Sequence, residues 1–203
     1  MHANAFLEDK MKSYFTKGEI ALWSSSVILI IVSFLIFDRA NYMTLIASLI
    51  GVTSLIFCAK GNPIGQVLII VFSLLYGAIS YSFGYYGEMA TYLGMTLPMA
   101  IFALISWLRN PYNGNKSEVK VNEIGKKETV FMWLLTAAVT AAFYFILKHF
   151  DTANLIPSTL SVMTSFLAVY LTFRRCPTYA LAYGANDVIL IVLWILASME
   201  NAK

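Results

Sequence analysis

The chain has 203 residues, of which 59% are hydrophobic and 12% are charged, and its formal net charge is +3. Soluble globular proteins carry about 25% charged residues. The composition therefore excludes an ordinary soluble domain and predicts an all-α integral membrane protein.

Residues 1–20 form a polar segment that precedes the first apolar run. Its first part, 2–17, fits either an amphipathic cytoplasmic helix or a frayed terminus. Because the segment lacks the small-residue cleavage site of a signal peptide, we expect the first apolar run to be retained as a membrane span.

Seven apolar runs follow, each close to the roughly 20 residues that cross a hydrocarbon core of about 30 Å. They cover about 21–37, 42–59, 64–82, 88–107, 129–147, 155–173 and 178–198. The connections are short except for the polar stretch 108–128. We therefore expect seven transmembrane helices and no separate soluble domain.

The cations predict the orientation, because cytoplasmic loops are rich in Lys and Arg. With a cytoplasmic N-terminus, 11 of the 14 cations lie inside, and the three outside are Arg39, Lys148 and Lys203. We predict N-terminus inside, a cytoplasmic loop at 108–128 and a short external tail at 199–203. The net charge then reflects topology, and nothing indicates a nucleic-acid partner.

The cysteines and histidines predict neither a disulfide nor a metal site. Cys58 and Cys176 both lie near the cytoplasmic face on this topology, where a structural disulfide is not expected. Two cysteines and two dispersed histidines do not form a metal-binding pattern.

The polar loop follows the fourth run, so the spans divide into a triplet at 21–82, a linker helix at 83–107 and a second triplet at 129–198. One extra crossing makes the triplets parallel, an arrangement known in transporters. Val52-Thr53-Ser54-Leu55 and Met163-Thr164-Ser165-Phe166 are a weak trace of a repeat. Each precedes a basic turn and a proline, Pro63 or Pro177, at the start of the next helix. The offsets of the two features differ by three residues, so chance similarity is an alternative.

The last run contains the main candidate site. Asp187 lies in its middle, directly after Asn186. A carboxylate at that depth costs roughly 3 kcal/mol or more, so it usually faces a polar cavity or a partner. Tyr179, Tyr183 and Asn186 share one helical face, which Asp187 adjoins. Two phenols and an amide suit a heteroaromatic ligand with hydroxyl groups, whereas the alternative is hydrogen bonding between packed helices.

Earlier spans offer further candidate ligands of the solute. Gln66 and Tyr76 in the third span are plausible counterparts of the set in the last span. Glu88 opens the fourth span, where the helix dipole alone would favour an acid. Thr53 either lines the path or serves as a small packing residue.

Proline and tryptophan positions give two structural expectations. Pro98 should kink the fourth span. The four tryptophans lie near span ends, so we interpret them as residues of the membrane-interface belt: Trp23, Trp107, Trp133 and Trp194.

Three stretches of the chain form a further pattern: Gly51-Val52-Thr53-Ser54 up to Ala59-Lys60-Gly61, Tyr85-Tyr86-Gly87-Glu88-Met89 up to Leu97-Pro98-Met99, and the last span. Together they resemble the PnuC vitamin transporters of bacteria. The resemblance implies three helices, a linker helix and three helices, as in enlarged SWEET sugar carriers. It also implies a bacterial cytoplasmic membrane, a homo-oligomer of which a trimer is the suggested form, and no cofactor.

The function that the resemblance implies is facilitated diffusion of an unphosphorylated vitamin or nucleoside, first of all nicotinamide riboside, which a cytoplasmic kinase then traps. Relatives are also thought to carry thiamine, riboflavin or deoxynucleosides. Nicotinamide riboside carriers tend to have two tryptophans and an asparagine at i, i+3 and i+7 in the last helix. Here these positions are Tyr179, Ala182 and Asn186, which leaves the substrate open.

Two other classes of function are alternatives to a carrier. An intramembrane enzyme needs a nucleophile with a base, or a metal cluster, but His2 and His149 both lie outside the spans. No Gly-x-Ser-x-Gly or His-Glu-x-x-His motif occurs, so we expect no enzyme and no catalytic residue. A membrane receptor or structural subunit, which would bind without flux, stays as the alternative.

Overall fold

The computed structural model describes residues 14–201, apart from the side chains at positions 194, 197, 198, 200 and 201. The segment 1–13 and the terminal residues 202–203 lie outside the described part. The prediction of an N-terminal amphipathic helix and the side chain of Trp194 therefore fall outside it.

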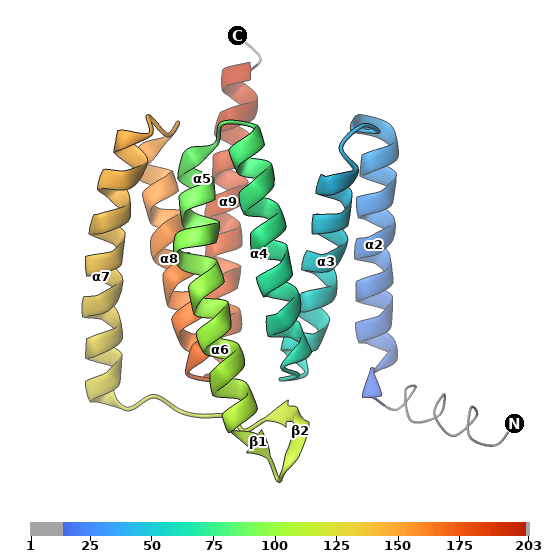
Figure 1. Cartoon of the computed structure of the whole chain (residues 1–203), viewed down its shortest axis with the longest axis vertical. Helices are drawn as coiled ribbons and strands as arrows, with labels where there is room; N and C mark the ends of the chain where they lie inside the picture. The colour runs from blue at the N-terminus through green and yellow to red at the C-terminus, as the bar shows by residue number, and fades with distance from the viewer. Residues whose placement is uncertain (1–13, 202–203) are drawn as a thin grey trace, which may run out of the picture.

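The described residues form seven rods of helix, which run alternately up and down and nearly parallel to one another (Figure 1). Their bounds are α2 Lys17–Phe37, α3 Tyr42–Ala59, α4 Ile64–Ser82, the continuous α5 Tyr86–Thr91, η1 Tyr92–Thr96 and α6 Leu97–Arg109, then α7 Lys126–His149, α8 Leu155–Phe173 and α9 Tyr179–Asn201. Six rods are long and apolar enough to cross a membrane, and α9 has an apolar part over Tyr179–Leu193. The prediction of an all-α membrane protein is confirmed, with six or seven membrane helices among the described residues.

Local chemistry fixes where the first helix begins. The Thr16 hydroxyl accepts a hydrogen bond from the Glu19 amide at 3.2 Å, and the Glu19 carboxylate accepts one from the Thr16 amide at 2.7 Å. This reciprocal capping box satisfies amide groups that would otherwise be unpaired at a helix start. Glu19 also pairs with Lys60 at 2.9 Å, so the start of α2 is tied to the end of α3.

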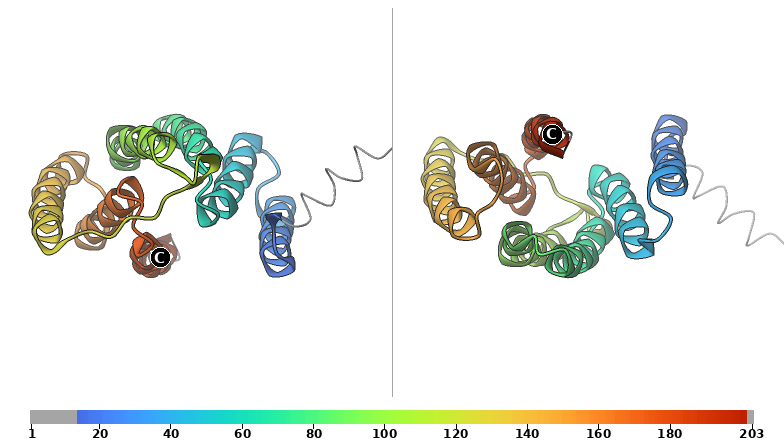
Figure 2. Two further views of the ribbon diagram at one scale, coloured as in Figure 1. Left: turned by 90° about the horizontal axis from the view of Figure 1, so that it is seen from below. Right: turned by 90° about the horizontal axis from the view of Figure 1, so that it is seen from above.

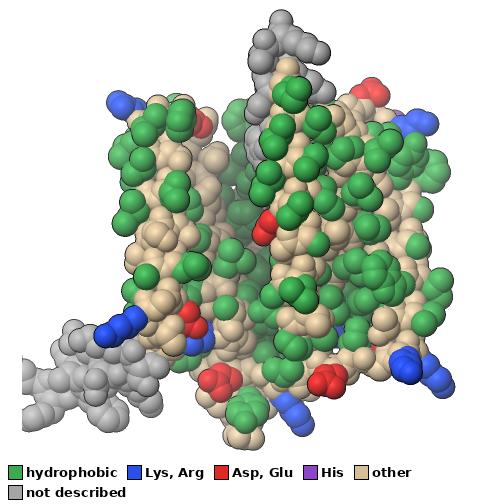
Figure 3. Space-filling model, turned by 180° about the vertical axis from the view of Figure 1, so that it is seen from behind, with side chains coloured by type: hydrophobic (Ala, Val, Ile, Leu, Met, Phe, Trp, Pro, Cys, Tyr) green, Lys and Arg blue, Asp and Glu red, His purple; other side chains and the backbone are tan. Residues whose placement is uncertain are grey.

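The helices pack as two groups of three with a helix between them. Helix α3 lies between α2 and α4, and α8 lies between α7 and α9, while α6 packs against both α4 and α8 (Figure 2). Among the described helices α8 has the largest number of buried residues, whereas α2 has none. The face drawn in Figure 3 has a broad and mainly apolar middle, with most of its charges at the two ends. This is the pattern of a chain surrounded by lipid.

The turns after α3 and α8 have the same conformation. Gly61 and Arg175 both adopt left-handed backbone angles, with φ of +64° and +60°. Each is two residues before a proline, and each follows a residue with ψ of 0° at the end of its helix. The two turns are 114 residues apart, which is the offset of the two prolines and not that of the Thr-Ser pairs in the sequence.

The polar connection contains a small hairpin that an all-α prediction missed. Strands β1, Pro111–Tyr112, and β2, Asn115–Val119, pair antiparallel. The turn between them is Asn113-Gly114, with φ of +47° and +79°. An Asn-Gly pair is the typical sequence of such a two-residue turn, so the signal was present.

The end of β2 and the segment that follows it link the two similar turns. The Val119 amide donates to the Gly61 carbonyl at 2.9 Å, and the Asn122 amide donates to the Arg175 carbonyl at 3.1 Å. The connection therefore lies across the ends of both helix groups on the side where most cations lie.

The linker rod is distorted next to Pro98, as expected, and the distortion takes the form of a π-helical turn over Tyr92–Thr96. The prediction that Trp107 is a belt residue is wrong. Its side chain is 1% exposed, and its indole N–H donates to the Thr172 carbonyl at 2.8 Å. The reason is that α6 lies against α8, so a residue near the end of the span is still covered by protein.

Candidate functional site

Asn186 is held on α9 by hydroxyl groups of α8. Its side chain is 7% exposed, and its Oδ1 lies 3.2, 2.9 and 3.0 Å from the hydroxyls of Ser161, Thr164 and Ser165. These three positions share one face of α8 because their spacing is i, i+3 and i+4. The Thr164 hydroxyl also lies 3.1 Å from the Leu160 carbonyl, which can take its single proton. The two serines then fill the two lone pairs of the amide oxygen.

The amide nitrogen of Asn186 is left with both its N–H donors. It makes no hydrogen bond with the described residues, and it is not among the enclosed polar atoms that lack a partner. The hydroxyls thus fix the orientation of the amide and direct its nitrogen toward accessible space. Such an arrangement can donate hydrogen bonds to a solute.

Asp187 lies one position further round α9 and is exposed. It makes no hydrogen bond or ion pair with the described residues, so none of the described cations neutralises it. Asn186 is therefore held by the hydroxyls of α8, whereas the neighbouring Asp187 has no partner among the described residues. On the face of the molecule that carries α9, the surface is hollowed between α9 and the first helices (Figure 3).

Three of the predicted residues meet around Cys58 at the end of α3. The Tyr179 hydroxyl donates to the Cys58 carbonyl at 3.0 Å, and the Gln66 amide lies 3.4 Å from the Cys58 sulfur. The rings of Tyr179 and Tyr183 are edge to face at 6.2 Å. Gln66 is 1% exposed, so it is a packed residue in this conformation. The Tyr179 bond connects the last helix to the first group of helices.

Thr53 lies apart from this group. Its hydroxyl donates to the Leu49 carbonyl at 2.7 Å and accepts from the Trp23 indole at 3.3 Å. This contact joins α2 to α3, so Trp23 is a packing residue here as well as a residue near a span end.

Tyr76 and Glu88 belong to a second cluster, between α4 and the linker rod. The Tyr76 ring is 4.6 Å from the ring of Tyr92 and 5.4 Å from that of Phe72. Glu88 is exposed and lies beside the buried hydroxyl of Ser80. Phe72 and Tyr92 were not predicted as site residues. Tyr92 lies four residues after Glu88, on the same face of the helix, and this spacing was an available signal. Tyr92 also begins the π-helical turn, and such turns often lie at functional sites.

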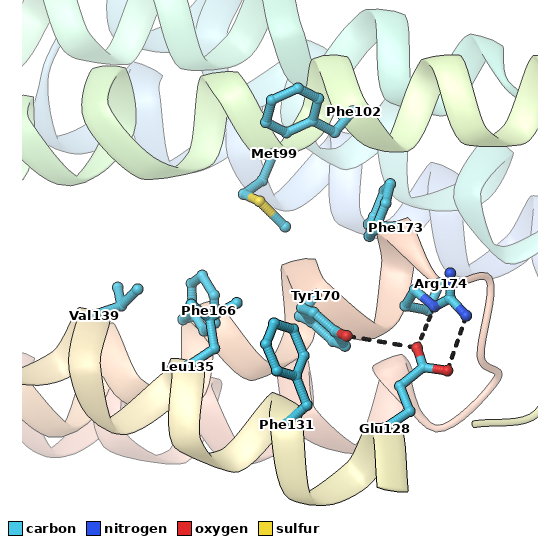
Figure 4. Close-up of a pocket in the computed structure, with 10 residues that line it drawn as sticks. All are labelled: Met99, Phe102, Glu128, Phe131, Leu135, Val139, Phe166, Tyr170, Phe173 and Arg174. Carbon is cyan, nitrogen blue, oxygen red and sulfur yellow. Dashed lines mark hydrogen bonds and ion pairs between the residues drawn. The ribbon is translucent and has the colours of Figure 1, made fainter. Parts of the chain in front are cut away.

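A cavity of about 530 Å³ lies elsewhere, between α6, α7 and α8. None of the predicted site residues lines it. Its walls are mainly apolar and aromatic, and an ion pair of Glu128 with Arg174 closes one end (Figure 4). The ten lining residues are Met99, Phe102, Glu128, Phe131, Leu135, Val139, Phe166, Tyr170, Phe173 and Arg174. A polar vitamin or nucleoside would find few partners there.

Comparison with known proteins identifies the family. A profile described as "Nicotinamide mononucleotide transporter" matches residues 41–201, which is most of the chain. The chain belongs to this family. The resemblance to PnuC proteins is thereby confirmed, and the chain is a member of a transporter family and not of an enzyme family.

Two related proteins agree with this family assignment. The nicotinamide riboside transporter PnuC of Neisseria mucosa is 24% identical over 172 residues, which are 83% of this chain and 65% of that protein. The match therefore spans slightly less than two thirds of the relative's length. The crystal structure of the vitamin B3 transporter PnuC superposes with a TM-score of 0.77 at 21% identity, covering 93% of this chain and 81% of that one. At this identity the likeness establishes the fold alone.

Proposed function

We propose that the protein is a membrane carrier for facilitated diffusion of an unphosphorylated vitamin or nucleoside, with nicotinamide riboside as the first candidate. The observation that carries the proposal is the buried Asn186 amide, whose oxygen is held by α8 hydroxyls and whose nitrogen is left for a solute. In a membrane helix, such polar groups mark a pathway more often than a lipid-facing surface. The name of the Neisseria relative supports the choice of substrate.

Two features keep other substrates open. The last helix has Tyr179 and Ala182 where nicotinamide riboside carriers tend to have tryptophans, so deoxynucleosides, thiamine and riboflavin stay as alternatives. Asp187, exposed and unpaired, would favour a cationic ring such as pyridinium or thiazolium if it faces the same hollow. A receptor or structural subunit that binds without flux is the alternative from another class.

The carrier is proposed to work as two parallel triplets, α2–α4 and α7–α9, on either side of the pathway. The matching turns at Gly61 and Arg175 support this, since equivalent positions in a repeat should have the same backbone conformation. The hydrogen bond from Tyr179 to Cys58 joins the triplets at the end that carries the hairpin. We infer that this contact closes the pathway there and must break for the solute to leave on that side.

The closed end is proposed to be the cytoplasmic one. It carries the hairpin and nine of the described Lys and Arg residues, whereas Arg39 and Lys148 lie at the other end. This distribution supports a cytoplasmic N-terminus and an external C-terminus. A homo-oligomer, with a trimer as the suggested form, and trapping of the solute by a cytoplasmic kinase complete the proposal.

Counterflow in proteoliposomes tests the function directly. Vesicles loaded with unlabelled nicotinamide riboside, thiamine, riboflavin or a deoxynucleoside should take up the matching labelled compound for at least one of the four, without an ion gradient or ATP. Asp187→Asn should slow exchange of the cationic compounds more than that of a neutral deoxynucleoside. Binding without exchange would favour the receptor, and folded protein that neither binds nor exchanges any of the four would refute the proposal.

A further inference from the structure

The groove between α6, α7 and α8 is open at the surface of the helix bundle. Helix α6 packs against α4 and α8 but not closely against α7, and the space between them is the cavity of about 530 Å³. Phe102 and Phe131 are 53% and 56% exposed along it. In a membrane, lipid or protein must fill such an apolar opening.

The length of the groove matches one leaflet of a bilayer. Along α7 its lining runs from Glu128 to Val139, which is about 16 Å at 1.5 Å per residue. Half of a hydrocarbon core of about 30 Å is about 15 Å. The groove begins at the end of the molecule that carries most of the cations, and it ends near the middle of the membrane.

The polar end of the groove keeps an unused donor. Arg174 pairs with Glu128 through Nε and through Nη2, the latter at 2.9 Å, and the Tyr170 hydroxyl donates to the same carboxylate at 3.5 Å. The other terminal nitrogen, Nη1, makes no hydrogen bond to the residues drawn around the cavity (Figure 4). Lys126 and Lys127 are exposed one turn or less before Glu128. The mouth is therefore net positive and can accept a phosphate, which guanidinium binds well.

We propose that this groove is a specific phospholipid site, in which one acyl chain of the leaflet on the hairpin side lies between α6 and α7 and the phosphate contacts Arg174. The one-leaflet length of the apolar lining and the net positive charge at its mouth favour a phospholipid as the occupant over a helix from a second copy, which would bring no phosphate to Arg174. The lipid would fill the gap that α6 and α7 leave and hold the linker rod against the second triplet.

The test measures lipid retention without any substrate, so it stands apart from transport. The full chain is purified in mild detergent from vesicles containing phosphatidylglycerol with a photoactivatable acyl chain, then analysed by native mass spectrometry and peptide mapping. Wild type should retain one phospholipid per chain, labelled on α6 or α7. Leu135→Trp, which fills the groove, should lose the retained lipid and at least five-fold of the labelling. Leu134→Trp is the matched control, since its side chain is 67% exposed on the same helix but does not line the cavity.

Two further variants cover the other outcomes. Val139→Trp fills the deep end and replaces Leu135→Trp if that protein does not fold. The double variant Glu128→Gln with Arg174→Gln removes the guanidinium that contacts the phosphate together with its partner charge, and it should lower the retention of phosphatidylglycerol. Equal retention in filled and control variants would overturn the proposal. So would a disulfide formed in membranes between two copies of a Phe131→Cys variant, because a second chain would then cover the groove.

Discussion

Replacing Asn186 by alanine should weaken solute binding far more than it weakens the fold. The change removes the two N–H donors that no described residue uses, and losing hydrogen bonds to a buried polar group costs about 1–3 kcal/mol. Since 1.4 kcal/mol is a factor of ten, the dissociation constant of the compound that exchanges in counterflow should rise about 5- to 150-fold. Interhelical hydrogen bonds in membranes average only about 0.6 kcal/mol, and the serines of α8 can turn to backbone carbonyls. The melting temperature should therefore change little.

Val188→Ala is the control for this comparison, because Val188 is two residues away on the same helix and 62% exposed. Equilibrium binding of the labelled compound, initial rates of counterflow and the melting temperature should be measured for both variants and for wild type. An Asn186→Ala protein that binds within two-fold of the Val188→Ala protein would refute the reasoning. A large loss of melting temperature with unchanged affinity would make Asn186 a packing residue only.

Two further predictions concern the proposed gate and the packing of the linker rod. Tyr179→Phe removes the hydrogen bond to the Cys58 carbonyl, worth about 1 kcal/mol. In a Cys176→Ser background, the Tyr179→Phe change should make Cys58 react about 5-fold faster with an impermeant thiol reagent applied from the hairpin side. An unchanged rate would contradict the proposal that the Tyr179 contact closes the pathway. Gly77→Ala should lower stability by about 1–3 kcal/mol, because its Cβ would lie 2.5 Å from Leu93. Gly94→Ala, whose Cβ would meet nothing within 4 Å, should be near neutral in the same thermal assay, and equal losses would refute the packing argument.

The membrane helices could be predicted from the sequence because hydrocarbon demands a long apolar run whatever the neighbouring helices do. The run predicted at 42–59 has the same bounds in α3. The burial of Trp107 could not be predicted in this way. An indole near the end of a span can lie at the membrane–water interface or be buried against another helix. Only the contact of α6 with α8 shows that Trp107 is buried.

The candidate site was predictable in its residue types but not in its partners. A helical wheel places Tyr179, Tyr183 and Asn186 on one face, and the structure keeps them there. The helical wheel cannot show that Tyr179 donates a hydrogen bond to Cys58, 121 residues away, or that the α8 hydroxyls hold the amide oxygen of Asn186. Phe72 was missed because an aromatic residue in an apolar run carries no signal until a second helix brings another ring beside it.

The offset of 114 residues has a consequence for how the two triplets differ. Under the proposed repeat, Asn186 and Ser165 in the second triplet correspond to Phe72 and Gly51 in the first. Asn186 contacts Ser165 through a hydrogen bond at 3.0 Å, and a Cβ placed on Gly51 would lie 3.2 Å from the Phe72 ring. The same helix contact is thus polar in one triplet and aromatic in the other. A solute with hydroxyl groups and a flat ring has both kinds of surface, and two unlike walls would orient it in a way that two identical walls could not.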